Sequence, residues 1–258
     1  MEARRNPDPD RTGAASRPSS SRPAVLLTFD DGYRDYHDVV CPLLRERGLS
    51  AVLFVITDYL DHPRLLPWDR LRLAVDRARA SRVRLPWSDG PAVELRSGAN
   101  RRALVDACLA HFRTVSGETR ARLVEDLVRA LDPDRIDQER HTMTWDEVRA
   151  VRDVTTIDAH THTHPPLSQV EPRVVEDEIR ISRDRIADQT GRAPTLFAYP
   201  HGLCTSAAKA LLPGLGFSVG FTATAGRIDA STDWLEAPRL GVTRTVPTGW
   251  MTAHSWRQ

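Results

Sequence analysis

The chain has 258 residues, of which 40% are hydrophobic, and its 36 lysines and arginines nearly balance its 35 aspartates and glutamates for a formal net charge of +1. This length and apolar content suffice for one large domain with a buried core. The charge balance gives no basis for a nucleic-acid partner or for an anionic membrane surface. No apolar run approaches the roughly 20 residues that a membrane-spanning helix needs.

The first 22 residues are rich in Ser, Pro, Arg and Asp and lack the apolar segment of a secretory signal. We therefore predict a disordered segment over residues 1–22 and a folded domain over residues 23–258. Three cysteines, Cys41, Cys108 and Cys204, lie far apart without a C-x-x-C pair. This pattern favours reduced thiols in a cytoplasmic protein over a disulfide framework.

The folded part opens with a strand, a helix and a second strand. Residues 24–29 predict a short buried strand, and residues 50–56 (SAVLFVI) predict another. Between them, apolar residues recur at helical spacing over residues 37–47, and Gly48 is typical of a helix end. This order indicates a parallel α/β unit.

Residues of about 65–140 differ in composition from the flanking regions, because they contain many arginines. Two helical segments stand out, residues 101–115 and residues 118–131, and the second carries a leucine stripe on one face. We predict a helical insertion on the main sheet, with a small separate domain as the alternative.

Strands and helices alternate again after the insertion, and Thr144 begins a capping-box sequence, TWDE. The predicted segments are a helix over 144–152, a strand over 154–159, a helix over 175–191, a strand over 195–199, a helix over 205–212 and a strand over 217–223. Repeated alternation predicts a barrel or an open parallel sheet, in which sites lie at the carboxyl ends of strands.

Two adjacent carboxylates, Asp30 and Asp31, follow the first strand in the stretch TFDDG. Like charges at close range raise each other's pKa, so the pair is costly unless a cation lies nearby. A metal ion or a reaction that needs a base would explain the arrangement, whereas the alternative is an ordinary turn.

A histidine cluster follows the strand at 154–159, in the stretch DAHTHTHPP. Neutral imidazoles are common ligands of zinc-like metals, and two histidines with one carboxylate leave open positions for a hydrolytic reaction. We therefore expect His160 and His164 to join a metal site, whereas His162 between them is the weakest candidate ligand. The alternative is a chance His-Thr repeat in a surface loop.

A third stretch, GRAPTLFAYPHG, places a turn directly after the strand at 195–199. Backbone N–H groups at such a turn can serve as oxyanion donors. Arg192 precedes the strand and could pair with a carboxylate, although it could equally be a surface arginine beside an ordinary loop.

The three stretches together resemble the polysaccharide deacetylase family, also called the NodB-homology or carbohydrate esterase family 4 group. TFDDG resembles its first motif, HTHTHP its second and RAPTLFAYPHG its third, in the same order and over most of residues 24–245. The resemblance implies an α/β fold, a distorted (β/α) barrel of seven strands. It also implies hydrolysis of N-acetyl groups on amino sugars of a glycan or related metabolite.

The resemblance implies a role for each matching residue. Asp31, His160 and His164 would bind a divalent metal, with zinc the expected ion. Asp30 would act as the general base and Arg192 would orient it, while the backbone N–H of Tyr199 would help to hold the oxyanion. Tyr199 and the neighbouring His201 would also contact the substrate.

Two departures from the family pattern stand out. Asp158 lies where a glycine is common, two residues before the first histidine ligand, and its charge has no explanation from the sequence. The late histidine that supplies the general acid has no clear match in residues 233–245. Three groups are left as candidate acids: His162, His201 and Asp30 itself, acting first as base and then as acid.

Other functions remain open at this point. The chain could hydrolyse another non-peptide C–N bond, as some relatives of this fold do on small cyclic amides. It could be a catalytically weak glycan-binding protein, as the missing histidine allows, although binding alone needs no second carboxylate. An amidohydrolase barrel is disfavoured because that fold carries its His-x-His on the first strand. The sequence determines neither the substrate nor the oligomeric state.

Overall fold

The computed structural model describes residues 24–136 and 140–242. Its centre is a parallel sheet of six strands in the order β1-β2-β5-β6-β7-β8, so the described residues supply one strand fewer than the expected seven. The strands are β1 (Leu27–Phe29), β2 (Ala51–Val55), β5 (Thr155–Ala159), β6 (Leu196–Ala198), β7 (Val219–Ala225) and β8 (Ala237–Arg239).

The sheet curls into a half-barrel. In a flat sheet the two edge strands, β1 and β8, would lie about 24 Å apart, since neighbouring strands are about 4.8 Å apart. Instead, Arg239 at the end of β8 donates hydrogen bonds of 2.8 and 2.9 Å to Asp30, directly after β1. The curl therefore brings the first and last strands face to face, which confirms the expected distorted barrel.

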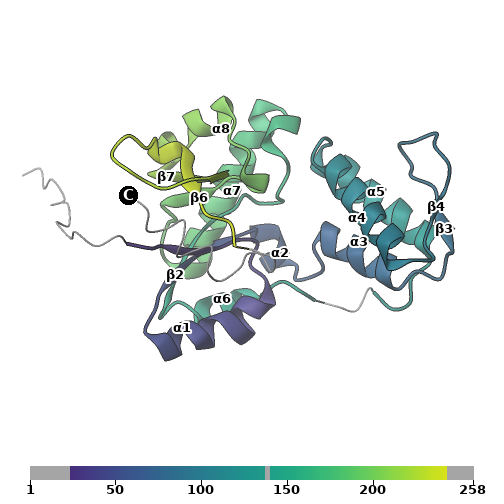
Figure 1. The fold of residues 1–258 in the computed structure, drawn as a ribbon. Helices are drawn as coiled ribbons and strands as arrows, with labels where there is room; N and C mark the ends of the chain where they lie inside the picture. Colours follow the sequence, from purple (N-terminus) through teal and green to yellow (C-terminus); the bar gives the residue numbers. More distant parts are fainter. Residues whose placement is uncertain (1–23, 137–139, 243–258) are drawn as a thin grey trace, which may run out of the picture.

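Four helices pack on one face of the curled sheet: α1 (Cys41–Arg47), α6 (Trp145–Ala150), α7 (Pro172–Thr190) and α8 (Ser206–Leu211). In Figure 1, α1 and α6 lie below the strands and α7 and α8 lie above them. They share a hydrophobic core with alternate residues of β2, Leu53 and Val55. The intervening Val52 and Phe54 pack with Phe221 in a second cluster on the other face. Such alternation is expected of a strand buried on both faces.

Several predicted element ends are confirmed in detail. Gly48 and Gly191 follow α1 and α7 in the left-handed conformation, with φ of 61° and 71°. Thr144 forms both hydrogen bonds of a capping box with Glu147 at the start of α6. The first strand is shorter than predicted because its pairing with β2 begins only at Leu27.

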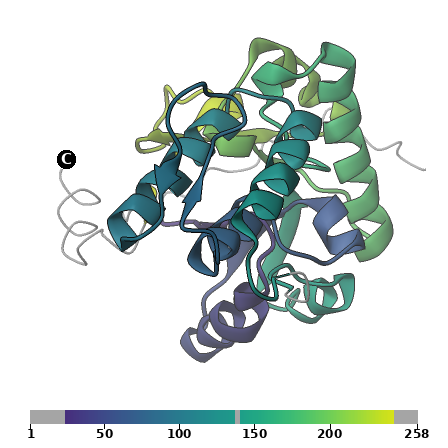
Figure 2. The same ribbon diagram turned by 90° about the vertical axis from the view of Figure 1, so that its right-hand side faces the viewer.

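The insertion consists of α3 (Pro67–Asp76), the hairpin strands β3 (Arg82–Val83) and β4 (Val93–Glu94), α4 (Gly98–Phe112) and α5 (Gly117–Leu131). The two predicted helices are confirmed, although α4 begins three residues early because Ser97 caps it, and it also ends three residues early, at Phe112. The insertion has a hydrophobic core of its own. It lies beside the sheet in Figure 1, and its helices are in front of the sheet in Figure 2.

A short helix, α2 (Thr57–Asp61), links β2 to the insertion and was not expected from the sequence. Within the two described stretches of chain, no helix is both long enough and apolar enough to cross a membrane.

Candidate metal centre and catalytic pocket

The candidate site residues meet at the carboxyl edge of the sheet. Asp30 and Asp31 follow β1, His160 and His164 follow β5, and His201 lies in the turn after β6. All five line one pocket with a volume of about 370 Å³. Parallel strands end at the same edge of a sheet, which is why segments far apart in the sequence converge there.

Three of these side chains have the spacing of metal ligands. Asp31 Oδ1 lies 3.4 Å from His160 Nε2 and 3.7 Å from His164 Nε2, and the two nitrogens are 3.2 Å apart. Ligand atoms about 2.1 Å from a tetrahedral ion are about 3.4 Å apart, so the three atoms suit a zinc-like ion. No other group of three such ligands is found within residues 24–136 and 140–242.

The protonation of the histidines also fits a cation. His160 Nδ1 lies 2.7 Å from the carbonyl oxygen of Ala198, so Nδ1 carries a proton and Nε2 faces Asp31. Burial opposes a charge on His160, but the nearby carboxylates of Asp31 and Asp30 outweigh it and raise its pKa. Burial holds the pKa of His164 well below its usual range, so that ring is neutral. A metal ion would replace the proton that the carboxylates attract to His160.

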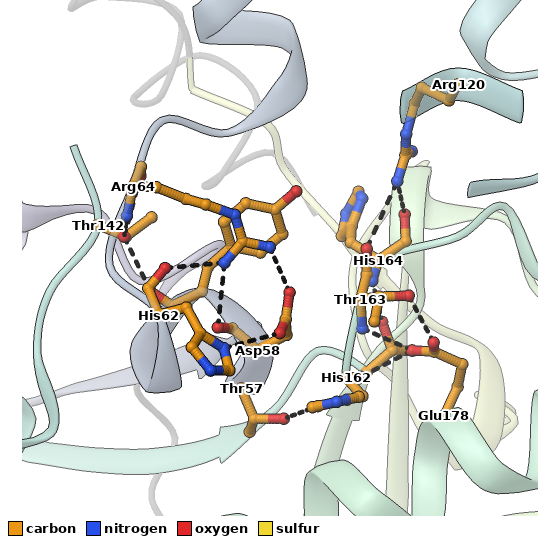
Figure 3. Close-up of polar contacts among 12 residues, drawn as sticks. Thr57, Asp58, His62, Arg64, Arg120, Thr142, His162, Thr163, His164 and Glu178 are labelled. Atoms are coloured by element: carbon orange, nitrogen blue, oxygen red, sulfur yellow. Dashed lines mark hydrogen bonds and ion pairs between the residues drawn. The ribbon is translucent and has the colours of Figure 1, made fainter. Parts of the chain in front are cut away.

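The loop that carries both histidine ligands is held by two other elements (Figure 3). Glu178 on α7 accepts hydrogen bonds from the backbone N–H groups of His162 and Thr163 at 2.8 and 2.7 Å. Arg120 on α5 donates to the carbonyl oxygen of His164 at 2.9 Å. These contacts support a strained segment, since His164 has a positive φ of 60°.

His162 is turned away from the candidate ligands. Its Nδ1 lies 2.9 Å from Thr57 Oγ1, at the start of α2, as Figure 3 shows. Its backbone contributes to the loop through Glu178, but its ring is not among the residues that line the pocket. The position of the ring removes His162 from the candidates for the general acid.

The guanidinium beside Asp30 belongs to Arg239, which sequence analysis did not identify. Its two terminal nitrogens donate to the two carboxylate oxygens of Asp30 in a bidentate pair. Burial would raise the pKa of Asp30, but the charges of His160 and Arg239 and this hydrogen bonding hold the pKa below its usual value. Asp30 is therefore ionised and fixed in orientation.

The prediction that Arg192 orients Asp30 is wrong. Arg192 precedes β6 and so lies toward the opposite end of the strands, where it donates to the carbonyl oxygen of Ile157 and to Asp158 Oδ2. Asp158 is fully buried and also accepts hydrogen bonds from the backbone N–H groups of Thr195 and Leu196. The unexplained charge of Asp158 thus anchors the start of β6.

The prediction that Tyr199 contributes an oxyanion donor and a substrate contact is also wrong. Its backbone N–H donates to the carbonyl oxygen of Phe221 at 3.0 Å, as part of the sheet. Its side chain is fully buried in the main core, and its hydroxyl donates to the carbonyl oxygen of Leu235. The pairing includes Tyr199, the last residue of the predicted strand, so its N–H is used in the sheet and is not free in the turn that begins at Pro200.

His201 does reach the pocket. Its ring lies 4.7 Å from that of His164, centroid to centroid, and its Nε2 is buried without a hydrogen-bond partner among the described residues. Burial and the charges of Arg120 and Arg113 lower its pKa to about 4, so the imidazole is neutral. The backbone of the turn is left-handed at His201, with a φ of 58°. The next residue must be glycine, because a side chain on Gly202 would overlap Ala223.

The insertion forms the facing wall of the pocket. Trp68 from α3 and two apolar side chains from α4, Leu109 and Phe112, line this wall. Three arginines complete it: Arg72, Arg113 and Arg120. Sequence analysis missed all six because they lie between the motifs. The sequence did contain one signal for Arg120. This charged residue lies at helical spacing from Val124, Leu127 and Leu131, on the apolar face of α5, where a charge is unusual.

Comparison with solved structures places the fold among known deacetylases. The chain is similar to the Streptococcus pyogenes deacetylase PplD in complex with acetate (17% identity, TM-score 0.56, 88% of this chain and 68% of that chain). It is also similar to a de-N-acetylase from Aggregatibacter actinomycetemcomitans (16% identity, TM-score 0.55, 91% and 76%) and to IcaB from Ammonifex degensii (16% identity, TM-score 0.54, 90% and 71%). These low identities support the fold alone.

Sequence comparison gives the family. No curated protein matches the chain. The model of the family described as polysaccharide deacetylase matches residues 17–94 and 118–220, which is well over half of the sequence and includes both strand ends that carry the candidate ligands. The chain therefore belongs to the polysaccharide deacetylase family.

Proposed function

We propose that this protein is a metal-dependent hydrolase that removes the N-acetyl group from an amino sugar of a glycan or related metabolite. The observation that carries the proposal is the ligand spacing of Asp31, His160 and His164, next to a carboxylate that Arg239 keeps ionised and oriented. A glycan-binding protein needs no such base, whereas amide hydrolysis does.

The residues suit a divalent metal, for which we propose zinc. Asp31, His160 and His164 would hold the ion, which would supply Lewis acidity in the pocket when bound. Asp30 lies one residue from the ligand Asp31, and its ionised carboxylate accepts the proton of the attacking water. Arg239 acts as a positioning residue because it fixes both oxygens of that carboxylate.

The oxyanion donor must be a group other than Tyr199, whose N–H is used in the sheet. Pro200 has no N–H, so the next backbone donor in the turn is that of His201, and we assign it this role. For protonation of the leaving amine, two of the three candidates stay at the pocket, His201 and Asp30.

The proposal is tested by measuring bound metals and acetate release on the same purified protein. We expect about one divalent ion per chain and acetate release from N-acetylated sugars, with an O-acetylated sugar as the comparison for ester hydrolysis. Restoring the metal after chelation should restore the activity. Protein that carries the metal but releases no acetate from any N-acetyl sugar would refute the proposal, and release only from other amides would point to the alternative C–N hydrolase.

A further inference from the structure

Arg120 carries a buried positive charge that its structural contacts do not neutralise. Its side chain is 3% exposed, and only Nη2 has hydrogen-bond partners, the carbonyl oxygens of Thr163 and His164. Nε and Nη1 are buried without a partner among the described residues, and no carboxylate of those residues forms an ion pair with Arg120. A buried, unpaired charge is costly, so a residue that only clamped the loop would not need a guanidinium.

Two further arginines of the insertion line the same pocket. Arg113 at the end of α4 is exposed and has no ion-pair partner within the described part of the chain. Among the residues that the structure describes, Arg72 on α3 forms one long ion pair, 3.6 Å from Nη1 to Asp69 Oδ1. The insertion wall thus presents three guanidinium groups to the pocket, and none of its lining residues is acidic.

The carboxylates on the opposite wall do not offset this charge. Asp30 is already paired with Arg239, and Asp31 belongs to the proposed metal site. A bound divalent ion would make the pocket still more positive. A neutral sugar would leave the positive charge of the arginines uncompensated, whereas an anionic sugar would supply the opposite charge.

We propose that Arg72, Arg113 and Arg120 form an anion-binding subsite, so that the acetylated sugar carries a phosphate or carboxylate group. This inference rests on the proposed function and specifies the substrate class of the same site. Trp68 lies near both the subsite and the ligands, with its ring 5.0 Å from that of His164 and 5.9 Å from the Arg120 guanidinium. An aromatic ring there suits the apolar face of the sugar, and a pocket of about 370 Å³ suits a monosaccharide unit with its charged group.

The test compares neutral and anionic substrates on the zinc-loaded enzyme. We expect kcat/KM to be at least about tenfold higher for an anionic sugar than for N-acetylglucosamine, as one charge-assisted hydrogen bond implies. N-acetylglucosamine 6-phosphate and 1-phosphate represent the phosphate class, and N-acetylmuramic acid represents the carboxylate class. The arm with the larger preference identifies the source of the anion.

Substitutions on the insertion wall should reduce that preference. Arg113→Gln should lower the anionic-to-neutral ratio about two- to fivefold because the side chain is exposed, and Arg120→Gln should lower it about tenfold or more. Arg120 also holds the metal-ligand loop, so Arg113→Gln provides the test should the Arg120 variant be unstable. Arg129→Gln on α5, where the side chain is 78% exposed, is the matched control and should leave the ratio unchanged.

Binding of inorganic phosphate by calorimetry supplies a readout that is independent of turnover. Wild-type protein should bind phosphate more tightly than the Arg113→Gln variant, and added salt should reduce the difference. Equal kcat/KM for neutral and anionic sugars, unchanged in both variants, would overturn the subsite and leave the deacetylase function intact. Arginine-dependent phosphate binding without hydrolysis of any N-acetyl sugar would support the subsite and refute the proposed function.

Discussion

The two walls of the pocket differ in how their charges are compensated. On the sheet wall, Asp30 is paired with Arg239, and Asp31 lies against two histidines. On the insertion wall, Arg113 and Arg120 have no ion-pair partner among the described residues. Charged side chains that are fixed by partners suit the catalytic step, which is the same for every substrate. Charged side chains without partners suit recognition of a substrate that carries the opposite charge. The comparison predicts that turnover and substrate preference can be altered separately.

The largest loss should follow from removing a metal ligand on the sheet wall. His164→Ala and His160→Ala should each lose most of the bound metal and all measurable deacetylation, because two ligands rarely retain a zinc-like ion. Elemental analysis of the purified variants measures the first effect, and acetate release measures the second. His162→Ala is the matched control from the same loop and should retain the metal. An empty site in that control, with metal retained in His164→Ala, would overturn the ligand assignment.

A smaller loss should follow from removing the base while keeping its shape. Asp30→Asn should retain the metal and reduce kcat by roughly a hundredfold or more, the usual contribution of a general base. Metal content and steady-state kinetics on the same sample test both parts. Turnover close to that of the wild type would assign proton transfer to another group.

Loss of the positioning residue should have a still smaller effect on the same step. Arg239→Gln should reduce kcat about tenfold to a hundredfold with little change in KM or metal content, because Asp30 is still present but less well oriented. Arg192→Gln is the control, since Arg192 contacts Asp158 instead: it should lower the melting temperature and leave kcat unchanged. The reverse pattern would restore the original assignment of Arg192.

The smallest effect is expected from a contact outside both walls. Hydrogen bonds from Arg140 and Thr144 lower the pKa of Glu147 to about 2, so its contribution to stability is complete above about pH 4.5 and is lost as the pH falls toward 2. Thr144→Ala should lower the free energy of unfolding by about 1 kcal/mol. Glu147→Gln should weaken the pH dependence of unfolding over that range. Acid denaturation measures both, and acetate release at neutral pH should be unaffected.

The parts of the site that the sequence predicts are those that local patterns carry. Asp31 and His160 lie within two residues of the end of an apolar strand, and His164 lies five residues after the second strand, so the carboxyl-edge rule brings them together without knowledge of the rest of the fold. Most helices and strands were predicted in the same way, because helix caps and hydrophobic periodicity are local properties of the sequence. It assigned the Tyr199 N–H wrongly because the strand pattern does not show whether the last N–H of a strand is paired, and that N–H donates to Phe221 of β7.

Residues that act through the curl of the sheet or through the insertion have no comparable signal. Arg239 is 209 positions from Asp30, and their contact depends on how far six strands bend. Arg192 was favoured only because it lies near a motif in the sequence. Arg120 could have been noticed as a charge on an apolar helix face, but the surface that it faces belongs to another part of the chain.

The ion pair between Asp30 and Arg239 also has a consequence for the order in which the protein is assembled. During synthesis, the metal ligands and the proposed base emerge well before β8, which carries the guanidinium at its end. A nascent chain that lacks the last strand can therefore hold the proposed ligands but cannot orient the base. Full hydrolytic competence should therefore appear when the last strand docks and Arg239 reaches Asp30, the same step that completes the curled sheet.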